Sequence, residues 1–238
     1  MIGWYDWAGG REAMLRFGPD HGPVVVAAMP LLEEWNRTRA FVVTLLRALA
    51  DRGIASVLPD LPGHGESLIP IADVTVLNLA QALEAVTDLL HAEGRATLGL
   101  GVRSGSLLDC RALHIGRWHL APVDPGELLR DIHKTWLAAE RRPEGQRSLE
   151  AMMYGDDDPV IVAGQALSSD FLSSLGGGGP FDEPGIPRRV VRLATDPRPA
   201  DRHVEGLPLW RRAESGNDPA LAITLADDIA AWVQTCVE

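Results

Sequence analysis

Hydrophobic residues along this chain alternate between short, nearly continuous runs and longer segments in which they recur every three or four positions. Pro23–Met29 (PVVVAAM) and Ala96–Val102 are runs of the first kind, which are typical of strands buried on both faces. Thr38–Arg52 and Val74–Glu93 have the second pattern, which is typical of amphipathic helices. Because the two kinds of segment alternate, we expect an α/β fold with a mostly parallel central sheet and helices on both faces.

The same criteria, applied along the whole chain, give a set of expected elements. The predicted strands are Ala13–Phe17, Pro23–Met29, Ile54–Leu58, Ala96–Val102, Ile115–Ala121, Val160–Val162, Arg189–Ala194 and Leu207–Arg212. The predicted helices are Thr38–Arg52, Val74–Glu93, Ser104–Leu113, Gly126–Glu140, Ser168–Leu175 and Ala220–Val233.

The pattern loosens between residues 126 and 186. This stretch is polar over Arg141–Asp158, and it contains the glycine run Gly176–Gly179, which we expect to be a hinge or a disordered loop. A segment of this kind, inserted between the later strands of a sheet, is where a cap over an active site would lie. We therefore expect a single domain over residues 1–238 with a small cap insertion at roughly 126–186.

The net charge and the composition limit the kinds of partner that this chain is expected to bind. The net charge of −11 argues against nucleic acid and against anionic membrane surfaces. We see no apolar run of the ~18 residues that a membrane span needs, and no signal-peptide pattern in Met1–Gly10. Cys110 and Cys236 lie far apart and suit reduced thiols. We expect a cytoplasmic protein whose partner is a small molecule; a homo-oligomer is compatible with the sequence.

The segment Leu98–Ser106 is predicted to run from a strand through a sharp turn, as in the G-x-S-x-G nucleophile elbow of α/β-hydrolases. Here the frame is Gly101-x-Arg103-x-Gly105, so an arginine stands at the position of the nucleophile. A guanidinium stays protonated and cannot attack a carbonyl. The usual serine-hydrolase mechanism therefore lacks its reacting atom.

Arg103 is expected to project into a pocket at the carboxyl edge of the sheet, where its charge must be paired or must hold a ligand. The loop after the strand Pro23–Met29 contains Glu33, Glu34 and Asn36. Glu34 is the first candidate partner of Arg103, and the pair has two interpretations, a structural ion pair or an anion or carbonyl site. Asn36 either caps the next helix or contacts the ligand.

The rest of a Ser-His-Asp triad is only partly present in this sequence. Asp196 follows a predicted strand at the usual place of the acid, with Asp201 as second choice. The loop after the last predicted strand, residues 213–218, contains no histidine, and His203 falls one loop too early. Ser104 lies beside the elbow outside the G-x-S-x-G frame, but its backbone N–H is a candidate oxyanion-hole donor.

Several motifs together resemble one family within the α/β-hydrolase superfamily, the second group of exosortase-A-system-associated hydrolases. They are Pro30-x-x-Glu33-Glu34-x-Asn36-x-x-Arg39, the loop Leu58–Ser67, the elbow at Arg103, Ala121–Gly126, Ala163–Ser168, and Leu209-Trp210 with Glu214. The resemblance spans most of the chain from Pro23 onward. It implies the α/β-hydrolase fold and an association with exopolysaccharide and protein-sorting systems. Met29 and Gln165 depart from the family, which usually has a proline and a tyrosine there.

Two functional hypotheses remain open. In the first, the protein is an enzyme acting on an acyl, ester or glycan-linked small molecule: Arg103 polarises the substrate, Glu34 is the base, Asn36 orients it and Asp196 is the remaining triad acid. In the second, it is a non-catalytic binding or assembly protein that retains the fold. Neither needs a cofactor or a metal. In both we expect these residues to contact the ligand: Glu33, Arg39, Ser104, Trp210 and Glu214.

Overall fold

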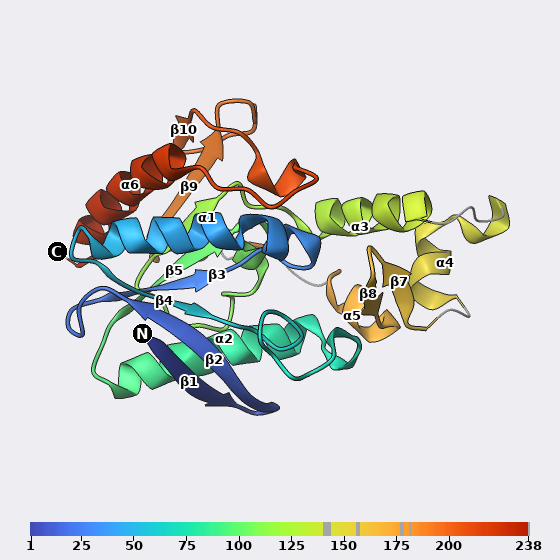
Figure 1. Ribbon diagram of the computed structural model, residues 1–238, viewed down its shortest axis with the longest axis horizontal. Coiled ribbons are helices and arrows are strands. Elements are labelled where there is room, and N and C mark those ends of the chain that lie inside the picture. The colour runs from blue at the N-terminus through green and yellow to red at the C-terminus, as the bar shows by residue number, and fades with distance from the viewer. Residues whose placement is uncertain (140–143, 156–157, 177–178, 181, 238) are drawn as a thin grey trace.

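The computed structural model describes residues 1–139, 144–155, 158–176, 179–180 and 182–237. Its centre is an eight-stranded sheet in the order β1-β2-β4-β3-β5-β6-β9-β10 (Figure 1). The pairs from β4 to β10 are parallel, while β1 and β2 pair antiparallel at one edge. The strands are β1 (Ile2–Trp7), β2 (Gly10–Phe17), β3 (Val24–Ala28), β4 (Ala55–Pro59), β5 (Thr97–Val102), β6 (Arg117–Leu120), β9 (Arg188–Leu193) and β10 (Arg202–Val204). The expected mostly parallel sheet is confirmed.

Helices cover both faces of this sheet (Figure 1). Helices α1 (Glu33–Ala50) and α6 (Pro219–Val237) lie on one face and share a core cluster with Leu98, Leu100 and Val102 of β5. Helix α2 (Val76–Ala92) lies on the other face with Val24 and Val26 of β3. Because successive strand residues point to opposite faces, the continuous apolar run of β3 supplies both clusters, with Val25 on the α1 side and Val24 and Val26 on the α2 side. Among the described helices, α6 is long and apolar enough to cross a membrane, but its stripe Leu225, Ile229 and Val233 is buried in the core.

The chain between β6 and β9 forms a separate layer beyond the carboxyl ends of the strands, at the right of Figure 1. It contains α3 (Pro125–Ala139), the 3₁₀ helix η3 (Glu144–Gln146), α4 (Leu149–Tyr154), the hairpin β7 (Val160–Val162) with β8 (Gln165–Leu167), and α5 (Ser169–Ser174). Trp136, Met152 and Phe171 join the α2 side of the core. This is the segment in which a cap was expected; residues 177 and 178 of its glycine run lie outside the described residues.

Two expected elements are wrong. The predicted helix Ser104–Leu113 is only a short 3₁₀ helix, η2 (Arg103–Leu107), because the Ser106 hydroxyl bonds back to the Arg103 carbonyl and serine and glycine are poor helix formers. The predicted strand Leu207–Arg212 contains instead the 3₁₀ helix η4 (Leu209–Arg211). The last strand is β10, which the sequence analysis missed together with β1 and β8. A further 3₁₀ helix, η1 (Ile71–Asp73), precedes α2.

Candidate functional site

The turn after β5 has the geometry of a nucleophile elbow but presents an arginine. Arg103 has φ 54°, in the left-handed region that a non-glycine residue adopts only at a cost. A side chain at Gly105 would collide with the Ala28 carbonyl at the end of β3, and one at Gly101 would come within 2.7 Å of Ser106 Cα. Both glycines of the motif are therefore required for the turn to fit against its neighbours.

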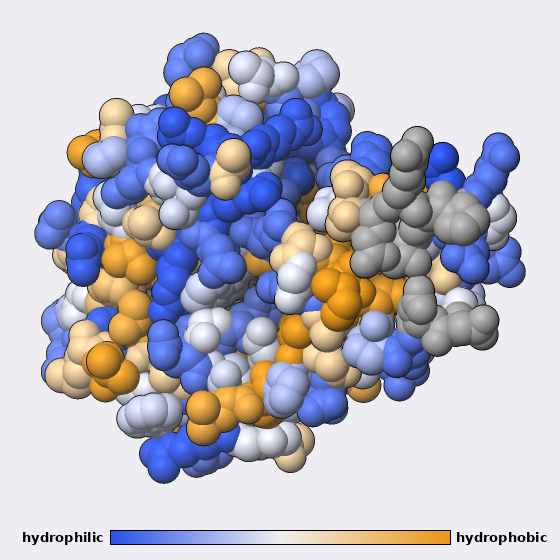
Figure 2. Space-filling view, turned by 45° about the vertical axis from the view of Figure 1, so that its right-hand side comes forward, coloured by the Kyte–Doolittle hydropathy of each residue, from blue (hydrophilic) through white to orange (hydrophobic). Residues whose placement is uncertain are grey.

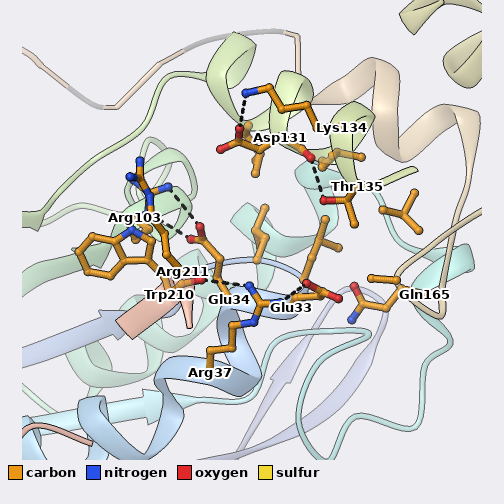
Figure 3. Close-up of a pocket in the computed structure, with 16 residues that line it drawn as sticks. Glu33, Glu34, Arg37, Arg103, Asp131, Lys134, Thr135, Gln165, Trp210 and Arg211 are labelled. Atoms are coloured by element: carbon orange, nitrogen blue, oxygen red, sulfur yellow. Dashed lines mark hydrogen bonds and ion pairs between the residues drawn. The ribbon is translucent and has the colours of Figure 1, made fainter. Parts of the chain in front are cut away.

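The Arg103 side chain forms a fork with Glu34 on the first turn of α1 (Figure 3). Its Nε donates to Glu34 Oε2 at 3.2 Å and its Nη2 to Oε1 at 3.1 Å. The guanidinium also lies 5.0 Å from the ring centroid of Trp210, and Nη1 donates weakly to the Ala121 carbonyl at 3.4 Å. The Arg103 side chain is only 5 % exposed, so this charge is compensated inside the protein.

Glu34 is a carboxylate in an unfavourable environment. Burial raises its pKa above the usual range, and the charge of Arg103 opposes that rise. Asp131 on α3 raises the pKa further, and Arg37 lowers it. Glu34 therefore combines a partly buried, proton-accepting carboxylate with a cation that both of its oxygens already contact.

Two cavities meet at Arg103 and Trp210. The larger, of about 450 Å³, lies between α1 and the segment after β6 and has an apolar wall of Leu31, Leu32, Leu128, Ile132 and Val162. Its charged wall carries Glu33, Glu34, Arg37, Arg103 and Arg211 (Figure 3). The smaller, of about 350 Å³, is lined by Glu127, Asp196, Arg198 and Arg211. Figure 2 shows hydrophilic side chains in the middle of the molecule beside a hydrophobic area near the grey residues.

Backbone strain is concentrated around these cavities. Among the described residues, the non-glycine positions with positive φ are Leu32 (60°), Arg103 (54°), Ala121 (45°) and Ala163 (49°). Leu32, Arg103 and Ala163 line the larger cavity, and Arg103 and Ala121 line the smaller. Each such position costs on the order of 1–3 kcal/mol, and such strain is typical of functional sites.

The backbone donors that an oxyanion hole would take from the turn after β3 are already occupied. The Leu31 N–H donates to Ser104 Oγ at 2.9 Å. The Leu32 N–H donates to His64 Nε2 at 3.3 Å, and burial lowers the pKa of His64, which favours the neutral ring that can accept this bond. The Ser104 side chain is fully buried, and its hydroxyl oxygen is occupied by the hydrogen bond from the Leu31 backbone.

The remaining triad positions are also committed to other contacts. Asp196 lines the smaller cavity, but Arg198 donates to both of its oxygens and Arg192 to Oδ2, and the Arg198 guanidinium holds the pKa of Asp196 well below its usual range. His203 lies on β10, exposed, with Nε2 at 3.1 Å from the carbonyl oxygens of Asp196 and Arg198. It does not line either cavity.

The structure separates several of the sequence-predicted ligand residues from Arg103. Asn36 is exposed and lines a shallow hollow beside the larger cavity. Arg39 pairs with Asp60 at 2.7 Å and stacks on Trp35, outside both cavities. Glu214 is exposed in a separate surface hollow. Glu33 does line the larger cavity, where it pairs with Arg37 at 2.6 Å.

A buried serine, histidine and aspartate also lie near the elbow, on the side away from the cavities. Asp109 accepts a hydrogen bond from His119 Nε2 at 3.0 Å, the tautomer being fixed because Arg188 donates to His119 Nδ1. The Ser106 hydroxyl donates instead to the Arg103 carbonyl. All three side chains are at most 1 % exposed, so we assign them a structural role.

Sequence reasoning missed most of the cavity wall. Arg37, Asp131 and Arg211 line the larger cavity, and Arg198 with Glu127 lines the smaller. The spacings of Glu33 and Arg37 on α1 and of Asp131 and Lys134 on α3 were the local signals that could have identified pairs in the larger cavity. The others come from segments distant in the sequence.

No family model and no curated protein matches this chain. Among solved structures, it is similar to Est1E from Butyrivibrio proteoclasticus with bound ferulic acid (TM-score 0.65, 13 % identity, 99 % of each chain covered). It is also similar to a protein from Agrobacterium tumefaciens that is provisionally described as an α/β hydrolase (TM-score 0.53, 12 % identity, 98 % of this chain and 95 % of that one). The chain has the α/β-hydrolase fold.

The same fold also occurs in a solved structure that is described as an epimerase and not as a hydrolase. The bottromycin epimerase BotH, in complex with bottromycin A2, matches with a TM-score of 0.55 and 14 % identity over 97 % of this chain and 98 % of that one. The α/β-hydrolase fold thus positions the elbow and the cavities, whereas the chemistry has to be argued from the side chains.

Proposed function

We propose that this protein binds a small molecule in the larger cavity and does not use a serine nucleophile. The observation that carries the proposal is the state of the elbow. Arg103 replaces the nucleophile and is held by Glu34, while the Leu31 and Leu32 N–H groups donate to Ser104 and His64. A tetrahedral oxyanion would need free donors at that position.

The strained backbone around the cavities favours a ligand-binding site over cavities that have no function. Leu32, Arg103, Ala121 and Ala163 retain unfavourable φ angles around the cavities although the nucleophile is missing. An apolar wall facing a few polar groups is typical of small-molecule sites.

A second candidate is an enzyme for an acyl, ester or glycan-linked substrate without the Ser-His-Asp triad. The raised pKa of Glu34 favours it, because a partly buried carboxylate with a raised pKa can act as a general base. Arg103 would then polarise a substrate carbonyl. Asn36 is exposed outside the larger cavity, so it takes no part in this version.

We further propose that the segment at roughly 126–186 is a cap and that the protein is cytoplasmic. The family resemblance adds the proposal that it serves an exopolysaccharide or exosortase system. The apolar wall of the larger cavity draws Leu128 and Ile132 from α3 and Val162 from β7, which supports the cap assignment.

Thermal-shift screening against a panel of small amphiphilic molecules tests the binding function. Leu128→Trp should block the larger cavity, since Leu128 lines it and is half-buried. Arg130→Trp is the matched control, an exposed position on the same helix outside the cavity. We expect ligands that raise the Tm of the wild type and of Arg130→Trp but not of Leu128→Trp. Binding that survives Leu128→Trp would contradict the proposal.

A further inference from the structure

The charges lining the two cavities are compensated with one exception. In the larger cavity Arg103 pairs with Glu34, Arg37 with Glu33 and Lys134 with Asp131. In the smaller, Arg198 pairs with both Glu127 and Asp196, and Arg192 adds a second partner to Asp196. Every lining carboxylate therefore has a cation within 3.5 Å.

Arg211 is the exception. Among the described residues that line the cavities, it is the cation whose guanidinium has neither a hydrogen bond nor an ion pair within the protein; it is exposed to solvent, and its backbone N–H donates to the Pro208 carbonyl. It lines both cavities and follows Trp210 directly, so it lies where they meet. Figure 3 places Arg103, Trp210 and Arg211 at one end of the larger cavity and Gln165 toward the other.

From this arrangement, and resting on the binding function proposed above, we propose that the ligand is an amphiphilic monoanion whose carboxylate pairs with Arg211. Its apolar part lies along Leu31, Leu128 and Ile132. A carboxylate matches the planar fork of an arginine in two parallel hydrogen bonds. One negative charge completes the compensation, whereas a dianion would leave an excess charge against Glu33 and Glu34.

The size of the cavity agrees with this class. A volume of about 450 Å³ lies in the range of small-molecule sites, which cover roughly 300–1,000 Å³. The apolar wall contributes binding free energy that does not depend on charge, at about 0.8 kcal/mol per buried CH₂. The head group then determines selectivity among molecules with the same chain.

Isothermal titration with octanoate, octanol and octylammonium separates the head group from the chain. We expect wild-type protein to bind octanoate at least tenfold more tightly than the other two. In Arg211→Gln, octanoate should fall to within about threefold of octanol, while octanol is unchanged. Arg212→Gln is the matched control, because Arg212 is the adjacent arginine, is exposed as Arg211 is, and lines neither cavity, so it should keep the full preference.

The outcomes distinguish this inference from the binding function on which it rests. Equal binding of octanoate and octanol to the wild type, or a preference that survives Arg211→Gln, overturns the monoanion and leaves the cavity as a binding site. If octanoate, octanol and octylammonium all fail to bind, but the screening panel yields a ligand whose binding Leu128→Trp abolishes, the monoanion inference is again wrong and the binding function stands. If neither experiment yields a ligand, both proposals are wrong.

Discussion

Arg103 occupies a backbone position that an arginine adopts only at a cost, and its charge is almost completely removed from water. Two contacts keep it there, the fork with Glu34 and the ring of Trp210. Neither contact would exist for a serine at this position. The turn after β5 therefore presents a fixed cation at the position where a nucleophile elbow presents a hydroxyl.

Removing Glu34 should destabilise the protein more than removing its neighbour. In Glu34→Ala the Arg103 charge stays buried without its partner, so the free energy of unfolding should fall by about 3 kcal/mol. Glu33→Ala is the control, because Glu33 and Arg37 are 38 % and 28 % exposed and such a pair contributes less than about 1 kcal/mol. Urea unfolding monitored by circular dichroism measures both. Equal losses in the two variants would mean that the Arg103–Glu34 pair contributes no more to the free energy of unfolding than the more exposed Arg37–Glu33 pair.

At the scale of elements, the hairpin β7–β8 shows how local sequence determines part of the cavity wall. Val162 pairs with Gln165, so Ala163 and Gly164 form a two-residue turn in which both have positive φ. This is the turn type whose twist matches that of a hairpin, and it favours Asn or Gly at its first position. The alanine there is strained, and it lines the larger cavity.

Ala163→Gly should therefore stabilise the protein. Removing a left-handed alanine relieves about 1–2 kcal/mol of strain. Glycine is more flexible in the unfolded state, and this offsets roughly 0.5–1 kcal/mol of the stabilisation. We expect a net rise of about 0.5–1 kcal/mol in the free energy of unfolding by urea titration. Ala166→Gly, in β8 with ordinary strand geometry, should lower stability instead. A loss of the same size in both variants would refute the strain at Ala163.

Periodicity alone was sufficient for the buried elements of the fold. The strands β3, β4 and β5 and the helices α1, α2 and α6 have apolar runs or stripes that few other structures could bury. It failed for β1, because Ile2 and Trp4 on this edge strand are exposed and no burial pattern marks it. It failed for η2 because serine side chains bond to the backbone there, which hydropathy does not record.

At the scale of the whole molecule, the site forms where segments far apart in the sequence meet. Arg103 and Glu34 could be placed together from sequence, because β3 and β5 are neighbouring parallel strands whose carboxyl ends meet at one edge. Arg211, Asp131 and Leu128 could not, since their positions depend on how η4 and α3 pack over that edge. Asn36, Arg39 and Glu214 were also expected to contact the ligand, and in the fold they lie outside both cavities.

The central claim is that the elbow holds no serine nucleophile, and intact-protein mass spectrometry after treatment with a fluorophosphonate tests it most directly. An active serine esterase treated in parallel confirms that the reagent is effective. Ser104 and Ser106 are fully buried and their hydroxyls are engaged with the Leu31 N–H and the Arg103 carbonyl, so we predict no mass increase for this protein. A stoichiometric adduct on either serine would contradict the account.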